Sequence, residues 1–104
     1  MTAREKIACL GAGRMGRGIA VVFAYAGHDV AVVDFKARPD ADFAKLAGEA
    51  LAEVERTLAT LAKLGMFDAS AVKTIAARVR VVPMAAAREA LSAADVIFEG
   101  VPNY

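Results

Sequence analysis

Short apolar runs alternate along this chain with longer segments in which apolar residues recur every three or four positions. The run at 6–10, KIACL, ends at a glycine, which is typical of a strand buried on both faces of a parallel sheet. Apolar spacing between residues 14 and 26 is helical, and Gly27 follows as a natural stop. A second apolar run at 30–33 ends at Asp34. These segments predict a strand, helix, strand unit with a right-handed crossover.

After Asp34 the pattern predicts a long helix, a second helix and two more strands. Apolar side chains at 43–61 are spaced by three or four, as in an amphipathic helix, which should end near Gly65. Asp68 is expected to cap a second helix running to about Ala77, so that the two helices form a hairpin. The remaining elements are a strand, a short helix and a strand at residues 79–82, 85–93 and 95–98.

This alternation predicts an α/β fold of the Rossmann type. We expect a doubly wound parallel sheet with helices on both faces and the strand order 3-2-1-4 of the first Rossmann half, with the helical hairpin inserted between the second and third strands. A complete dinucleotide-binding domain continues with two more strands. We therefore expect residues 1–104 to be one domain, truncated after the fourth strand and taken from a longer protein.

Composition narrows the class of protein. Although 58% of the 104 residues are hydrophobic, the longest apolar run, 19–26, is too short to span a bilayer. Glycines interrupt the first apolar run, so we expect no secretory signal and a cytoplasmic protein. A net charge of +1 without a basic run argues against nucleic-acid binding. The single cysteine, Cys9, is expected to be a buried filler, and no disulfide or metal site is expected.

Glycines crowd the junction between the first strand and the first helix. Gly11, Gly13 and Gly16 match the pattern G-x-G-x-x-G, which is weak alone but specific after a strand and before a helix. The first glycine would allow the tight turn, the second the approach of a pyrophosphate, and the third close packing of helix and strand. Backbone N–H groups at Arg14 and Met15, together with the helix dipole, would attract the phosphates. We expect the Met15 side chain to serve packing.

An acid follows at the expected distance. Asp34 ends the second strand, 18 residues after the last glycine of the motif, where a carboxylate bonds the ribose hydroxyls of the adenosine and repels the extra phosphate of NADP. NAD is therefore the favoured cofactor. Lys36 and Arg38 could in principle neutralise a 2′-phosphate, but we interpret them as solvated loop charges. His28 is interpreted as a surface turn residue at the opposite end of the sheet. Glu99, after the fourth strand, is either a contact to the nicotinamide ribose or an ordinary loop acid.

Three features besides the glycine motif are typical of one protein family. With GAGRMGRGIA at 11–20, the Asp34 strand end, LAKLGMFD at 61–68 and ADVIFEGVP at 94–102, the chain resembles the NAD-binding domain of the 3-hydroxyacyl-CoA dehydrogenase family. The resemblance implies oxidation of an L-3-hydroxyacyl-CoA, 3-hydroxybutyryl-CoA-like, to the 3-ketoacyl-CoA with hydride transfer to NAD. It also implies a homodimer whose acyl-CoA substrate binds through a separate helical domain. The cofactor-binding residues carried over are Gly11, Ala12, Gly13, Arg14, Met15 and Gly16 at the pyrophosphate, Asp34 at the adenosine ribose, and Glu99, Gly100 and Val101 at the nicotinamide ribose.

Two departures limit what the resemblance implies. Asn103 stands where the family commonly has an acid, which leaves subfamily and substrate open. The family's catalytic histidine and its glutamate partner lie beyond the fourth strand, so no catalytic residue is expected in this chain, which should bind cofactor without turnover. The alternatives are a dehydrogenase of the same family acting on a sugar acid such as gulonate or on carnitine, and a non-catalytic, crystallin-like nucleotide-binding module. The exposed face of the long helix is expected to carry Lys45, Glu49, Glu53 and Arg56.

Overall fold

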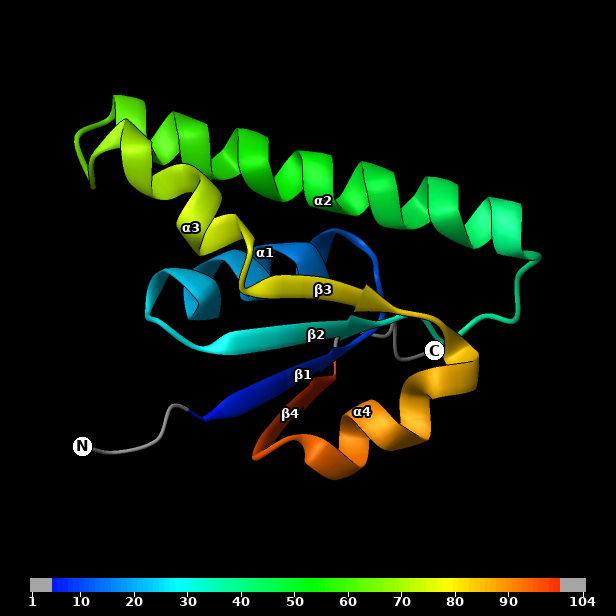
Figure 1. Cartoon of the computed structure of the whole chain (residues 1–104). Coiled ribbons are helices and arrows are strands. Elements are labelled where there is room, and N and C mark those ends of the chain that lie inside the picture. Colours follow the sequence, from blue (N-terminus) through cyan, green and yellow to red (C-terminus); the bar gives the residue numbers. More distant parts are fainter. Residues whose placement is uncertain (1–4, 100–104) are drawn as a thin grey trace.

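Four parallel strands form a single sheet in the order β3-β2-β1-β4 (Figure 1). This computed structural model describes residues 5–99. The strands are β1 (Lys6–Leu10), β2 (Asp29–Val33), β3 (Val79–Val82) and β4 (Val96–Glu99). In register, Leu10 of β1 lies beside both Val33 and Glu99, so the carboxyl ends of the strands meet along one edge of the sheet. The predicted order 3-2-1-4 is confirmed.

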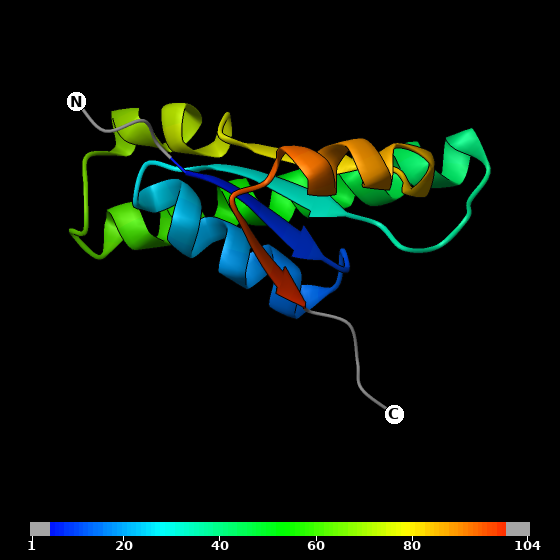
Figure 2. The same ribbon diagram turned by 90° about the horizontal axis from the view of Figure 1, so that it is seen from below.

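Helices cover both faces of the sheet, as the alternating pattern predicts. Figure 1 shows the first three helices on one side and the fourth on the other, and the view from below in Figure 2 places the fourth helix in front of the sheet. Their bounds are α1 (Arg14–Tyr25), α2 (Asp40–Lys63), α3 (Val72–Ala76) and α4 (Ala87–Ala93), with short 3-10 turns η1 (Ala69–Ala71) and η2 (Met84–Ala86) before the last two.

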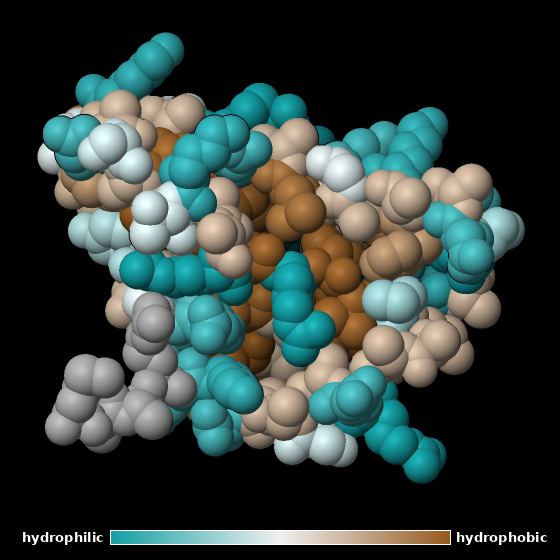
Figure 3. Space-filling view, viewed as in Figure 1, coloured by the Kyte–Doolittle hydropathy of each residue, from teal (hydrophilic) through white to brown (hydrophobic). Residues whose placement is uncertain are grey.

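Strand β2 shows why the sheet needs two helical layers. Val30 and Val32 belong to the larger hydrophobic core with α1 and α2, whereas Ala31 and Val33 belong to a smaller core with α4. Successive side chains of a strand point to opposite faces, so an uninterrupted apolar run requires cover on both. On the side of the molecule that shows the outer strand β3, hydrophobic residues gather in the middle, with polar residues around them and one polar side chain across them (Figure 3).

The inserted helical hairpin forms as predicted, with small differences at its ends. Helix α2 begins at Asp40, three residues before the expected first apolar position, and Gly65, with φ +85°, follows its end. Asp68 caps the next segment by accepting a hydrogen bond from the Ser70 N–H at 2.9 Å. That bond, together with one to the Ser70 side chain, lowers the pKa of Asp68. The segment begins with the 3-10 turn η1 and continues as α3; 3-10 turns are frequent at the start of helices.

Candidate functional site

The turn after β1 brings the chain back over the end of β2. Gly11 has φ 100°, a left-handed conformation that favours glycine. Its N–H donates to the Val33 carbonyl oxygen at 2.8 Å, and the Asp34 N–H donates to the Val82 carbonyl oxygen at 2.9 Å. Backbone hydrogen bonds thus place the glycine turn and the residue after β2 side by side where the carboxyl ends of the strands meet. We call this end of the sheet its carboxyl edge and the opposite end its amino edge.

The N-terminus of α1 is open to a ligand. Gly13 is its N-cap, no side chain caps it, and no acidic residue stands in its first turn. The first N–H groups of a helix have no partner within the helix and carry the positive end of its dipole. A Cβ built on Gly13 meets nothing within 4 Å, so an anionic group has room to lie against this backbone. The residues present therefore fit a pyrophosphate.

Gly16 serves close packing instead. A Cβ built there would lie 2.2 Å from the Gly11 carbonyl oxygen, a distance that no side chain tolerates. The absent side chain lets α1 begin directly against the turn. Met15, between these glycines, is 65% exposed, so the expectation that its side chain serves packing is wrong, and Arg14 is exposed as well.

Arg17 ties the glycine turn to the inserted hairpin. Its Nε donates to the Ala12 carbonyl oxygen at 2.9 Å, and its NH1 donates to Glu53 Oε2 at 3.0 Å. Glu53 is therefore held in an ion pair with α1, whereas the sequence pattern placed it on the solvated face of the long helix. This contact joins residues 36 positions apart, and local spacing carries no signal for it.

Asp34 lies at the carboxyl end of β2 and is nearly buried. Its side chain is 4% exposed. The backbone N–H of Lys36 donates to Oδ1 at 3.2 Å, and Arg38 donates from Nε to Oδ2 at 2.6 Å and from NH2 to Oδ1 at 3.4 Å. The hydrogen bond to Asp34 raises the pKa of Arg38. Arg38 was expected to be a solvated loop charge, and that expectation is wrong, because the loop after β2 folds its guanidinium onto the carboxylate.

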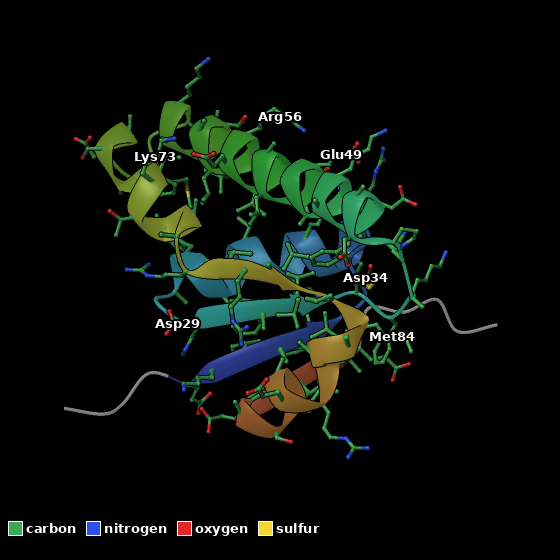
Figure 4. All side chains as sticks on the ribbon, turned by 45° about the vertical axis from the view of Figure 1, so that its right-hand side comes forward. Asp29, Asp34, Glu49, Arg56, Lys73 and Met84 are labelled. Atoms are coloured by element: carbon green, nitrogen blue, oxygen red, sulfur yellow. The ribbon has the colours of Figure 1, made fainter. Side chains whose placement is uncertain are left out.

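A hollow of about 530 Å³ opens next to this pair. Its walls are formed by the loop after β2, the start of α2 and the turn after β3, at Lys36, Ala37, Arg38, Asp40, Phe43, Pro83, Met84 and Ala85. Figure 4 shows Asp34 and Met84 toward one end of the sheet and Asp29 at the other end of β2. A largely apolar recess beside a carboxylate suits a purine base and its ribose.

The other candidate residues divide between the two sheet edges. His28 precedes β2 at the amino edge, where its Nδ1 lies 3.2 Å from the Glu5 carbonyl oxygen and its ring meets Phe23 edge-on. Glu99 lies exposed at the carboxyl edge, in register with Leu10. Gly100 and Val101 lie outside the described residues. Another hollow, of about 320 Å³, opens at the amino edge, away from the carboxyl ends where α/β folds bind ligands.

Cys9 offers no nucleophile. It is fully buried in β1, and burial raises the pKa of its thiol from 9.0 to about 11, so the thiol stays protonated near neutral pH. Among residues 5–99 no cluster of histidine, cysteine and acidic side chains is arranged to hold a metal ion. The described helices include none that is long and apolar enough to cross a bilayer.

Sheet order, glycine turn and acidic strand end together define a dinucleotide-binding domain of the dehydrogenase type. A family model described as the NAD binding domain of 3-hydroxyacyl-CoA dehydrogenase matches residues 6–104. The chain belongs to this family, and its cofactor is NAD.

Solved structures agree with this assignment. The chain is similar to (S)-3-hydroxybutyryl-CoA dehydrogenase PaaH1 from Ralstonia eutropha, with 27% identity and TM-score 0.75 over 98% of this chain and 33% of that one. Similarity to 3-hydroxybutyryl-CoA dehydrogenase from Escherichia coli K12 gives 26% identity and TM-score 0.74 over 99% of this chain and 20% of that one. M. tuberculosis FadB2, at 22% identity and TM-score 0.76 over 99% of this chain and 33% of that one, shares the fold. A comparison with curated protein sequences finds no match. The chain thus spans a third or less of these three structures.

Proposed function

We propose that this chain is the cofactor-binding part of an enzyme that oxidises an L-3-hydroxyacyl-CoA of the 3-hydroxybutyryl-CoA type to the 3-ketoacyl-CoA. One observation carries the proposal: the open N-terminus of α1 and the carboxylate of Asp34 lie side by side at the carboxyl edge of the sheet. A similarity of 27% and 26% identity to two 3-hydroxybutyryl-CoA dehydrogenases supports the choice of substrate.

Different residues at the carboxyl edge bind different parts of NAD in this proposal. The segment from Gly11 to Gly16 receives the pyrophosphate: Gly11 makes the turn, with its own N–H bonded to Val33, and the backbone N–H groups of Ala12, Gly13, Arg14, Met15 and Gly16 face the phosphates. Asp34 receives the adenosine ribose, and the apolar recess beside Met84 receives the adenine. Glu99, Gly100 and Val101 are assigned to the nicotinamide ribose on the family resemblance.

The chain's residues orient the cofactor and do not supply the acid–base chemistry. NAD, when bound, accepts the hydride released from the hydroxyl-bearing carbon. A base must take the hydroxyl proton as the carbonyl forms, and we assign that base to a catalytic helical domain outside this chain, which also binds the acyl-CoA. We further propose that the complete protein is a cytoplasmic homodimer, which its family resemblance supports and light scattering of the purified protein would test.

A substrate comparison on the complete protein tests the reaction. Purified protein is given NADH with acetoacetyl-CoA, with the keto form of a sugar acid such as gulonate, or with dehydrocarnitine, and NADH oxidation is followed by absorbance. We expect acetoacetyl-CoA to have the highest kcat/KM. A preference for either other substrate would contradict the proposed substrate class. Binding of NADH with no oxidation on any substrate would instead favour a non-catalytic nucleotide-binding module.

A further inference from the structure

Both oxygens of the ribose-binding acid are already occupied by groups of this chain. Arg38 reaches both oxygens of Asp34, and the Lys36 N–H bonds one of them. A carboxylate at the end of β2 selects NAD in two ways: it accepts from the ribose hydroxyls, and its charge repels a 2′-phosphate. In this chain the second effect is weakened, because the Arg38 guanidinium lies 2.6 Å from the carboxylate and offsets part of its charge.

We propose that Arg38 makes this site tolerant of a 2′-phosphate on the adenosine ribose, so that the domain binds NADP nearly as well as NAD. The inference rests on the proposed cofactor site and concerns only the adenosine end of the nucleotide. Arg38 acts here as a specificity-determining residue, since its guanidinium would contact the phosphate while Asp34 still accepts a hydrogen bond from the 3′-hydroxyl.

The exposed fractions of the Asp34 and Arg38 side chains support these separate roles. The Asp34 side chain is 4% exposed and that of Arg38 is 31% exposed, so a ligand in the hollow meets the guanidinium before it meets the carboxylate. Arginine carries five N–H donors in a planar fork that suits phosphate. The bonds to Asp34 use Nε and one N–H of NH2, and within residues 5–99 the other N–H groups have no hydrogen-bond partner. Both Arg38 and Lys36 line the hollow.

Nearby acids explain why we infer tolerance and not a preference for NADP. Asp40 and Asp42 stand in the first turn of α2, and Asp42 contributes to the raised pKa of Arg38. With Asp34 these acids outnumber the two basic residues of the loop, Lys36 and Arg38. The positive end of the α2 dipole offsets part of their charge. The 2′-phosphate therefore finds one well-placed cation in surroundings that are close to balanced.

Fluorescence titration of the chain with NADH and NADPH tests the inference through binding alone. For the unchanged chain we expect dissociation constants within about tenfold of each other. Arg38→Gln should weaken NADPH about tenfold or more and leave NADH nearly unchanged, because only the phosphate loses its cation. Asp34→Asn should shift the ratio the other way, weakening NADH and strengthening NADPH. Arg56→Gln removes the same charge from the exposed face of α2, distant from Asp34 in Figure 4, and should alter neither constant.

Three other results of these titrations would each contradict a specific part of the proposal. NADH binding with NADPH weaker by more than about tenfold overturns the tolerance alone. An equal loss of both nucleotides in Arg38→Gln, with an unchanged melting temperature, assigns Arg38 to holding the loop and overturns its role toward the phosphate. If neither nucleotide binds the unchanged chain, the proposed cofactor site fails and the inference fails with it.

Discussion

At the scale of single residues, Gly13 and Gly16 belong to one motif but face different surroundings. Gly13 has extended backbone, φ −76° and ψ −174°, and open space above it, whereas a side chain on Gly16 would strike the Gly11 carbonyl oxygen. The two positions therefore separate ligand binding from folding, and substitutions at each should produce different defects.

We expect Gly13→Val to abolish NADH binding while the melting temperature stays nearly unchanged, because a Cβ at this position meets no protein atom within 4 Å and the side chain would enter the space of the pyrophosphate. Gly16→Ala should lower the melting temperature, since its Cβ would lie 2.2 Å from a backbone oxygen. Gly18→Ala is the matched control: it meets nothing within 4 Å in the same helix and should raise stability by about 0.5–1 kcal/mol. Thermal denaturation and NADH fluorescence measure both effects. Unchanged affinity in Gly13→Val would contradict the site.

The buried thiol of Cys9 predicts how the free energy of unfolding changes at alkaline pH. Burial raises the pKa of its thiol from 9.0 to about 11, so between these values the unfolded chain has lost the proton that the folded chain still holds. Stability should therefore fall as pH rises from 9 toward 11, by at most about 1.4 kcal/mol per pH unit from this group. Urea denaturation of the unchanged chain and of Cys9→Ala at several pH values should show a shallower fall for the variant. Equal slopes would contradict this account.

The sequence identifies the site residues better than it identifies their partners. Gly11 and Asp34 are predictable because a tight turn and a strand end have local signatures. Arg17 is missed, and Arg38 is named but interpreted as a solvated charge, although both contact the site, because an arginine in a helix or loop shows no spacing that reveals where its guanidinium goes. The position of Arg38 four residues after Asp34 was the available signal, and it does not tell whether the guanidinium bonds the carboxylate or stays in solvent.

At the scale of elements, one ion pair connects the cofactor turn to the inserted hairpin. Arg17 of α1 holds Glu53 of α2 and the Ala12 carbonyl oxygen together. The two side chains are 18% and 34% exposed, so solvent screens them less than it screens a surface pair. The long helix thereby supports the turn that faces the pyrophosphate.

Arg17→Leu should lower the free energy of unfolding by about 1–3 kcal/mol, the usual cost of removing a hydrogen bond to a charged group. It should also weaken NADH binding several-fold, because the turn at Ala12 loses its tether. Lys73→Ala removes a similar pair, to Glu55 at 3.0 Å, whose side chains are 87% and 41% exposed, and should change stability by less than about 1 kcal/mol. Urea denaturation and NADH titration measure the two effects. Equal losses in the two variants would contradict a special role for Arg17.

Elements were predictable where their periodicity is strong. The run 30–33 and the spacing of Ala50, Val54 and Leu58 identify β2 and α2, and these side chains are buried. Ends were harder to predict, since α2 begins in a polar stretch at Asp40 that carries no apolar signal. The 3-10 turns were missed because three residues are too few to show a period.

At the scale of the whole molecule, the two edges of the sheet separate the only histidine from the cofactor site. His28 precedes β2 and Asp34 follows it, with the five residues of the strand between them. His28 and Asp34 are six residues apart along an extended chain, so at about 3.3 Å per residue their Cα atoms lie roughly 20 Å apart. A general base must come within hydrogen-bond reach of the proton it removes. His28 therefore cannot serve a hydride transfer at the carboxyl edge.

The chain of residues 1–104 should accordingly bind NADH without oxidising it when acetoacetyl-CoA is added. Fluorescence titration measures the binding and absorbance measures the turnover, in the same sample. His28→Ala should change neither result, because its ring lies against Phe23 and the Glu5 carbonyl oxygen at the far edge. Glu99 is the exposed acid at the end of β4 on the cofactor side. Turnover that disappears in Glu99→Gln would assign the base to this strand end and would contradict our placing of the base in another domain.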